Sequence, residues 1–437
     1  MKIKVVKFGG SSLADAEHFR RVREIVLSDP ARRYVVVSAP GKRFGLDRKV
    51  TDLLYACYEA ASNEEPIDDI FSLIEERYTN ILRDLGLSLD FSGEFQQIRT
   101  SITHNAGRDY VVSRGEYLCG KILSAYLGFD FLDPQKYIRF GDDGQLDAEE
   151  TNRRMHTAML RHDRAIIPGF YGSMPNGTIK TFSRGGSDIT GSIAARAISA
   201  DLYENWTDVS GFLMADPRYV ENPKPIDTIT YRELRELSYM GATVLHEEAI
   251  FPVRYAGIPI NIRNTNRPED KGSMIVAAAA PEDNAGVITG IAGKSGFSII
   301  AIEKDMMNTE VGFGRKLLSM FEDRHICFEH LPSGIDTMSV ILHTDDLKPV
   351  REEVLKEIKA ELDPEMLYVE DRIALIAVVG RGMVKAKGTA AKIFGALADA
   401  DINIKMIDQG SSELNIIIGV EEKDFGPALQ SIYSAFA

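Results

Sequence analysis

Residues 4–13 read KVVKFGGSSL, and this stretch shows how the chain begins to fold. Its apolar run with one lysine is typical of a buried strand, and the following DAEHFRRVREIVLSD (15–29) has the spacing of an amphipathic helix. Gly9 and Gly10 mark the turn between strand and helix. A second apolar run, YVVVSAP (34–40), comes after the helix. A strand, a helix and another buried strand in succession predict an α/β domain with a parallel sheet.

The same alternation continues to about residue 280. We expect further strands at 164–170, 201–209 and 259–264, and helices at 49–61, 116–127, 188–198 and 231–238. This order predicts a doubly wound, mostly parallel sheet whose ligands lie at the carboxyl ends of the strands. Residues 62–111 are polar with helical spacing and predict a helical insertion or lid, whose role the sequence leaves open.

Composition excludes several classes of protein. The chain has 437 residues, of which 44% are hydrophobic and 27% charged, so it is long enough for about two or three globular domains. Its net charge of −14 argues against nucleic acid as a main partner. Its 3 cysteines are far apart and suggest neither a disulfide framework nor a metal site. We find no signal-peptide pattern and no apolar stretch of membrane-spanning length, and therefore expect a cytoplasmic protein.

The C-terminal part contains an internal repeat. Residues 300–342 align without a gap with residues 376–418, an offset of 76 positions. Both copies show a βαββαβ pattern, so two ferredoxin-like modules are predicted. The second copy lacks its last strand, and GVITGIAG (286–293) is our candidate for the missing edge. Residues with an identical partner in the second copy include Ile300, Ala301, Met307, Gly312, Asp323, Ile326, Gly334 and Ile341.

Two Gly-Gly turns carry the first chemical signal. Gly9-Gly10 follows a strand that ends near Lys7, and glycines before a helix let backbone N–H groups approach a phosphate. Alone, this pattern fits an ordinary turn equally well. A second pair occurs in SRGGSDITGS (183–192), where Arg184 precedes the turn and Ser187 or Asp188 is a plausible helix cap. Two such turns, each with a basic residue nearby, favour an anion site.

Two weaker motifs complete the set. In VVSRGEYLCG (111–120), we expect Glu116 in the first turn of a helix, where it either interacts favourably with the helix dipole or receives a substrate ammonium. In NWTDVSGFLMADPR (205–218), a strand ends at Thr207-Asp208, and a loop carries Asp216 and Arg218.

Together, VKFGGSS, VVSRGE, SRGGSDITGS, WTDVSGFLMADPR and MGATVLHEEAI occur in the order typical of aspartate kinases. The chain resembles this family over nearly its whole length, and the C-terminal pair, with MIDQGSSELNIII, resembles its two ACT modules. The resemblance implies an amino acid kinase domain at 1–282, a first ACT domain at 283–371 and a second at 372–437.

The resemblance also implies residue roles. Lys7 would be catalytic, and Asp188 would orient it. The aspartate site would contain Ser38, Thr51, Glu116, Phe170, Arg184 and Ser187. ATP would contact Lys7, Gly9, Gly10, Ser11, Thr207, Asp208, Asp216 and Arg218, and Mg²⁺ would be held mainly by phosphates and water rather than by a protein metal site.

This sequence departs from the family pattern at a few positions. Ser11 stands where many members have threonine, and Leu213 stands where a tyrosine often touches the nucleotide. Thr243 replaces a common lysine, and Glu247 replaces a proline. These changes bear on nucleotide affinity more than on the reaction.

The implied reaction transfers the γ-phosphoryl group of ATP to the β-carboxylate of L-aspartate, the first step toward lysine, threonine and methionine. An amino-acid effector would inhibit it through the ACT modules, with lysine expected and threonine as the alternative. Glu329, Ser333 and Asp336 are the candidate effector contacts, and the modules would also form a homodimer or tetramer. Two other readings stay open: a glutamate-type amino acid kinase, and a non-catalytic amino-acid sensor.

Overall fold

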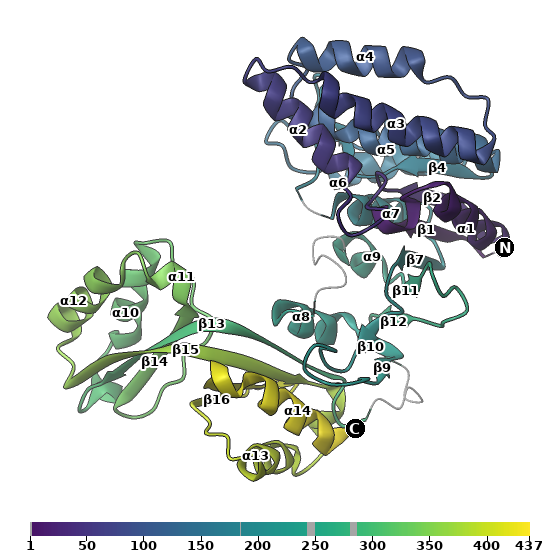
Figure 1. The fold of residues 1–437 in the computed structure, drawn as a ribbon. Coiled ribbons are helices and arrows are strands. Elements are labelled where there is room, and N and C mark those ends of the chain that lie inside the picture. The colour runs from purple at the N-terminus through teal and green to yellow at the C-terminus, as the bar shows by residue number, and fades with distance from the viewer. Residues whose placement is uncertain (1, 184, 243–249, 280–285) are drawn as a thin grey trace. The chain divides into compact units, whose positions relative to one another are not determined.

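The computed structural model describes residues 2–183, 185–242, 250–279 and 286–437 (Figure 1). The chain divides into two compact units. The first comprises Met1–Phe212, Asp227–Tyr231 and Val244–Ala280. The second comprises Leu213–Ile226, Arg232–Thr243 and Pro281–Ala437. Two short segments inside the predicted kinase domain, 213–226 and 232–243, therefore group with the C-terminal repeats.

The first unit is built on an eight-stranded sheet in the order β10-β12-β11-β7-β1-β2-β4-β3. Neighbouring strands are parallel except for β11 and β12, as expected for a mostly parallel sheet. The strands are β1 (Lys4–Phe8), β2 (Arg32–Val37), β3 (Asp130–Phe131), β4 (Ala165–Pro168), β7 (Leu202–Thr207), β10 (Thr228–Thr230), β11 (Ile260–Asn264) and β12 (Ser273–Val276).

Alternation along β1 assigns its side chains to the two faces of this sheet. Val6 and Phe8 belong to a buried core formed with the helices α1 to α5, whereas Lys7 lies on the face where α7 packs against β1, β2 and β7. The predicted helical segment 62–111 contains α3 and α4. The helices are α1 (Ala16–Leu27), α2 (Val50–Ser62), α3 (Asp68–Leu85), α4 (Ser92–Thr103), α5 (Arg108–Leu127), α6 (Ala148–Met159), α7 (Gly186–Ala197) and α9 (Phe251–Ala256).

Residues 1–280 also contain several short elements. They are the 3-10 helices η1 (Gly10–Leu13) and η2 (Pro134–Lys136), the hairpin β5 (Tyr171–Ser173) and β6 (Ile179–Thr181), and the paired strands β8 (Phe212–Leu213) and β9 (Pro225–Ile226).

The second unit has one five-stranded antiparallel sheet in the order β14-β13-β15-β17-β16. Two long strands run through both repeats. Residues 297–303 of β13 pair with β14 in the first repeat, whereas residues 290–293 pair with 376–379 of β15 in the second. The edge of the second repeat is thus supplied by the segment that precedes the first. The strands are β13 (Gly290–Glu303), β14 (Thr337–His343), β15 (Met366–Val379), β16 (Met406–Asp408) and β17 (Asn415–Glu421).

The two repeats also agree in local conformation. Gly312 and Gly388 both have a positive φ, 88° and 84°, directly before the equivalent helices α10 and α13. In the first repeat, the expected second strand is reduced to isolated bridges at His330 and Ser333. The helices are α8 (Tyr231–Tyr239), α10 (Phe313–Glu322), α11 (Thr344–Leu347), α12 (Arg351–Leu362), α13 (Thr389–Asp399), α14 (Phe425–Phe436), η4 (Met307–Thr309), η5 (Arg381–Lys385) and η6 (Glu422–Asp424).

Helix α8 explains why residues 232–243 group with the repeats. The fully buried carboxylate of Glu233 accepts hydrogen bonds from the Thr289 hydroxyl at 2.5 Å and from the Arg381 backbone N–H at 2.9 Å, and it pairs with the Arg381 guanidinium at 2.9 Å. A buried carboxylate needs such partners, because an unpaired charge in a protein interior is very costly.

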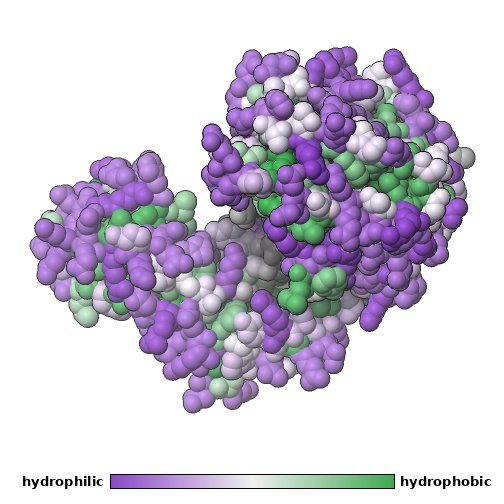
Figure 2. Space-filling model, turned by 45° about the horizontal axis from the view of Figure 1, so that its top comes forward, coloured by the Kyte–Doolittle hydropathy of each residue, from purple (hydrophilic) through white to green (hydrophobic). Residues whose placement is uncertain are grey.

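Within the described residues, the helices are all too short or too polar to cross a lipid bilayer. On the face shown in Figure 2, hydrophilic residues cover most of the surface of both units, and hydrophobic residues form small groups.

Candidate active site

A cavity of about 690 Å³ opens at the carboxyl ends of the central parallel strands of the first unit. The strands β1, β2 and β7 all end there, so residues from distant parts of the sequence meet at one edge of the sheet. The described lining consists of Lys7, Gly9, Gly10, Ser11, Ser38, Ala39, Pro40, Gly41, Lys42, Lys49, Thr51, Tyr55, Glu116, Phe170, Ser183, Gly185, Gly186, Ser187, Asp188, Thr207 and Asp208.

The first Gly-Gly turn packs directly against the loop after β2. The Gly9 N–H donates to the Trp206 carbonyl at 3.0 Å, and the Gly41 N–H donates to the Gly10 carbonyl at 2.8 Å. A Cβ atom on Gly10 would lie 2.8 Å from the Ala39 carbonyl oxygen. Gly10 is therefore required for this close backbone approach, and the same lack of side chains leaves the turn open toward the cavity.

Lys7 is held by two polar side chains at the bottom of the cavity. Its ammonium lies 2.5 Å from Oδ1 of Asp188 and 3.5 Å from Oδ1 of Asn205. The Asn205 amide in turn donates to Asp188 Oδ1 at 2.8 Å. Lys7 is only 7% exposed, so this network fixes one cation at the end of β1. A fixed, partly desolvated cation is suited to stabilise a phosphoryl group in transfer.

After the second Gly-Gly turn, α7 starts at Gly186, two residues earlier than expected. The N-cap is Gly185, with φ 61°, and no side chain caps the helix. Ser187 and Asp188 therefore lie in its first turn rather than at the cap. This leaves the Asp188 carboxylate free to pair with Lys7. Arg184, predicted to bind a carboxylate, lies outside the described residues.

Glu116 lies in the middle of α5, not in the first turn of a helix, because α5 begins at Arg108. The helix continues through Gly115, where a Cβ atom would lie 2.7 Å from that of Ala39. This close packing brings the Glu116 carboxylate beside the loop after β2, and its Oε1 accepts the Ala39 N–H at 3.1 Å.

The other Glu116 oxygen, Oε2, is buried without a hydrogen-bond partner among the described residues. Burial raises the pKa of Glu116 to about 8, against smaller opposing effects of the Ala39 N–H and the Arg114 charge. A buried carboxylate in a cavity wall, with one oxygen that lacks a donor, fits an incoming ammonium group.

Phe170 lines the cavity with a strained backbone. Its φ is 82°, an uncommon value for a bulky residue, and its N–H donates to the Thr190 hydroxyl at 3.0 Å. Such strain is often found at functional sites. Ser38, at the end of β2, and Thr51, in the first turn of α2, line the same cavity.

The predicted nucleotide residues fall into two groups. Thr207 and Asp208 line the cavity, at the end of β7. Asp216 and Arg218 belong to the second unit, where they form an exposed ion pair at 2.5 Å that lowers the pKa of Asp216. Leu213 is 40% exposed. Thr243 and Glu247 lie outside the described residues. The residues described here contain no cluster of three or more acidic, histidine or cysteine side chains that could hold a metal.

The sequence analysis missed several residues of the site, among them Asn205, Lys42 and Lys49. Asn205 had a detectable signal, because LYENWT places two polar residues, Glu204 and Asn205, in an otherwise buried strand. Lys42 and Lys49 had no such signal in the sequence, since a basic residue in a polar loop is usually a solvated surface residue without a binding role.

The candidate effector residues lie in the first repeat, between α10 and β14. The Glu329 side chain is 8% exposed and lies 3.4 Å from His343 Nε2. Burial and the nearby Glu329 carboxylate raise the pKa of Tyr239 to about 12. Ser333 forms an isolated β-bridge with Met338, and Asp336 Oδ1 accepts a hydrogen bond from the Met306 N–H at 2.9 Å.

Comparison with known proteins agrees with this architecture. The sequence model of the amino acid kinase family matches residues 2–264, and that of an ACT domain matches residues 376–436. Aspartokinase 3 of Bacillus subtilis (strain 168) is 40% identical over 449 residues, which cover 99% of this chain and 98% of that protein. The crystal structure of Clostridium acetobutylicum aspartate kinase matches with a TM-score of 0.92, 52% identity and complete coverage of both chains.

A more distant structural match is aspartokinase III of E. coli. Its complex with aspartate and ADP has a TM-score of 0.75 and 26% identity, with 99% of each chain covered. Its complex with lysine and aspartate has a TM-score of 0.74 at the same identity, with both chains fully covered. The chain belongs to the amino acid kinase family and, within it, to the aspartokinases with a C-terminal ACT domain.

Proposed function

We propose that this aspartokinase transfers the γ-phosphoryl group of ATP to the β-carboxylate of L-aspartate in the cavity at the ends of β1, β2 and β7. The observation that carries the proposal is the convergence of Lys7, both Gly-Gly turns and the buried Glu116 carboxylate on one cavity. One end of such a site suits a polyanion, and the carboxylate suits the ammonium of an amino acid.

The reaction needs no general base. A free β-carboxylate has a pKa of about 3.9 and is already ionised at neutral pH. The barrier comes from bringing this anion to the γ-phosphate, so catalysis consists of positioning and positive charge. Lys7 supplies the charge, and Asp188 and Asn205 hold it in place.

The proposed substrate contacts combine residues of the cavity lining with Arg184, which is assigned by the family pattern alone. Glu116 accepts the α-ammonium through its free Oε2, and Arg184 binds the α-carboxylate. Phe170 shapes the pocket, which limits the length of the acid. The remaining predicted contacts are Ser38, Thr51 and Ser187, all in the cavity wall.

The lining residues also fit the phosphate groups of a nucleotide. Gly9, Gly10 and Ser11 line the cavity, the two glycines without side chains, and Thr207 and Asp208 lie at its β7 end. Asp216 and Arg218 are assigned to the rest of ATP by the family pattern alone. Bound Mg²⁺, held mainly by phosphates and water, would neutralise part of the phosphate charge.

The test is an ADP-release assay with L-aspartate, with L-glutamate and with neither. We expect release with aspartate and a rate at least about tenfold lower with glutamate, the lower end of the range for one methylene. Equal or faster release with glutamate would indicate a glutamate-type kinase. No amino-acid-dependent release would indicate a sensor.

Lysine is the proposed effector, with threonine as the alternative. The support is the complex of E. coli aspartokinase III with lysine and the acidic residues of the first repeat. Glu329 and Asp336 would pair with the lysine amines, and Ser333 would donate a hydroxyl. Inhibition then requires that lysine bind an inactive arrangement more tightly than the active one.

We assign the kinase domain to residues 1–282 and the ACT domains to 283–371 and 372–437, in a cytoplasmic enzyme. We further propose that the ACT modules form a homodimer or tetramer. Exposed apolar side chains on the first repeat support this, since such groups often mark protein interfaces. They include Met306, Val311, Ile335, Met366 and Tyr368, each more than half exposed. Sedimentation velocity will determine the assembly.

A further inference from the structure

Two lysine side chains of the loop at 41–49 form part of the wall of the catalytic cavity. Lys42 and Lys49 both line the cavity, and both side chains are exposed. Neither forms an ion pair with another described residue. Cations at the mouth of an anion-binding cavity attract anionic reactants, but a long exposed loop must be held in shape for the charges to be well placed.

Arg77, on α3, forms hydrogen bonds that fix the conformation of this loop. Its side chain is 4% exposed, and its guanidinium reaches both ends of the loop. Nη1 donates to the Gly41 carbonyl at 2.8 Å, and Nη2 donates to the Arg48 carbonyl at 3.2 Å. A longer contact of 3.4 Å joins Nη1 to the Ala14 carbonyl, just after the Gly9-Gly10 turn. One buried side chain therefore contacts both ends of the loop at 41–49 and the residue that follows η1.

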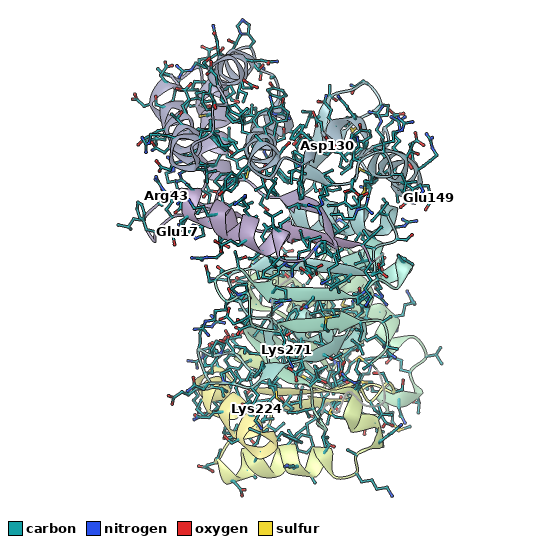
Figure 3. The ribbon with its side chains drawn as sticks, turned by 90° about the vertical axis from the view of Figure 1, so that its right-hand side faces the viewer. Glu17, Arg43, Asp130, Glu149, Lys224 and Lys271 are labelled. Atoms are coloured by element: carbon teal, nitrogen blue, oxygen red, sulfur yellow. The ribbon has the colours of Figure 1, made fainter. Side chains whose placement is uncertain are left out.

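Asp47 is the second fixed point of the loop. Its carboxylate is 8% exposed and lies 2.6 Å from Arg77 Nη2. Arg43 binds the same carboxylate with its backbone N–H and its guanidinium, both at 2.9 Å. Figure 3 shows Arg43 at the outer surface of the first unit. These hydrogen bonds tie the middle of the loop to α3.

The loop is also in direct backbone contact with the first Gly-Gly turn. The Gly41 N–H donates to the Gly10 carbonyl at 2.8 Å, and a Cβ atom on Gly41 would lie only 2.6 Å from the Gly10 carbonyl carbon. A shift of Gly41 would therefore displace Gly10 as well as Lys42.

We propose that Arg77 is a positioning residue of the catalytic cavity, and that the loop it holds presents Lys42 and Lys49 to the anionic oxygens of the reactants. This inference rests on the proposed function and assigns a role to the helical segment 62–111. The oxygens belong to the carboxylates of aspartate or to the phosphates of ATP.

Steady-state kinetics of the full chain distinguish these two sources. For the variant Lys42→Ala/Lys49→Ala, we expect one KM to rise about tenfold, the loss of about one charge-assisted hydrogen bond, with kcat within about twofold. A rise in the KM for aspartate identifies the carboxylates, and a rise in the KM for MgATP identifies the phosphates. Lys271→Ala, an exposed lysine of the same unit labelled in Figure 3, is the control and leaves both values unchanged. Two unchanged KM values in the double variant would overturn the proposal.

A mutant cycle tests the role of Arg77. Arg77→Lys retains the charge but cannot make the same set of hydrogen bonds, so we expect it to raise the same KM. Removing the two lysines in the Arg77→Lys background then adds less than about twofold, because the loop no longer places them. Fully additive effects would show that Arg77 acts only on stability.

Two further variants keep this test decisive. Asp47→Asn replaces Arg77→Lys in the cycle if the latter does not fold. Arg99→Lys alters an arginine on α4 that pairs with Asp68 and Glu75 and leaves KM unchanged. A wild-type enzyme without aspartate-dependent ADP release would refute the proposed function itself, whereas an active wild type with an additive cycle refutes only this inference.

Discussion

The ammonium nitrogen of Lys7 lies 2.5 Å from a carboxylate oxygen of Asp188. Lys7 is the next-to-last residue of the first strand, and Asp188 lies in the first turn of α7, after the second Gly-Gly turn. Their contact shows that the two glycine turns converge on one cavity. Asn205, on β7, bonds to Asp188 and comes within 3.5 Å of Lys7, so three separate elements fix the position of the cation.

Lys7→Ala should abolish most of the turnover. Because the charge acts on the phosphoryl group in transfer, we expect kcat to fall about 100-fold or more, with much smaller changes in KM. The measurement is the steady-state rate of aspartyl phosphate formation, trapped with hydroxylamine. A kcat near that of wild type would remove Lys7 from the catalytic residues.

Aspartate binding should release a proton from Glu116. With a pKa of about 8 in the free cavity, this carboxyl group is mostly protonated at neutral pH, whereas the substrate ammonium favours the carboxylate. We therefore expect the KM for aspartate to fall as pH rises toward about 8, by at most about tenfold per pH unit. Glu116→Gln should bind more weakly and lose this dependence. A wild-type KM that stays constant over this range would contradict the assignment.

The same group also makes stability pH-dependent, with a definite sign. Between about pH 4.5 and 8, the folded ligand-free state retains a proton that the unfolded chain has lost. Glu116 therefore stabilises the fold most below its unfolded pKa, and this contribution disappears as pH rises to about 8. Urea unfolding at several pH values is the measurement: the wild type should lose stability relative to Glu116→Gln as pH rises from about 4.5 to about 8.

Gly293→Ala should destabilise the second repeat. A Cβ atom at this position of β13 would lie 2.5 Å from the Phe425 ring and 2.7 Å from the Leu375 carbonyl oxygen. We expect a loss of about 1–3 kcal/mol in the free energy of unfolding. Gly395→Ala, in α13 with open space around it, is the control and should gain about 0.5–1 kcal/mol. Urea midpoints that move in the same direction for both variants would count against β13 as a packed strand of that repeat.

Glu329→Gln should weaken inhibition by lysine. Losing one charge-assisted hydrogen bond to an amine raises the half-inhibitory lysine concentration by about tenfold or more. Asp336→Asn should act in the same direction. Glu352→Gln changes an exposed carboxylate of the same repeat and serves as the control. Unchanged inhibition in both Glu329→Gln and Asp336→Asn would exclude these residues from the effector site.

The local pattern of the chain determined much of the architecture. Apolar runs and glycine turns predicted β1, β2, β4, β7 and β11, because burial on both faces of a parallel sheet requires nearly continuous apolar residues. The offset of 76 positions predicted two equivalent modules, whose helices and left-handed glycines coincide in the structure. Most predicted site residues of the first unit line one cavity for the same reason: parallel strands bring their carboxyl ends to one edge.

Tertiary contacts decided the rest. The Glu116 carboxylate lies beside the loop after β2 because Gly115 lets α5 pack against Ala39, a contact between residues far apart in sequence. Arg77 can bond to the loop at 41–49 only because α3 packs beside that loop. Asn205 lies near Lys7 only because their strands are neighbours in the sheet. Helical and strand periodicity reflect which side of an element is buried. They carry no information on which distant residue lies opposite, and the polar contacts of this site depend on that pairing.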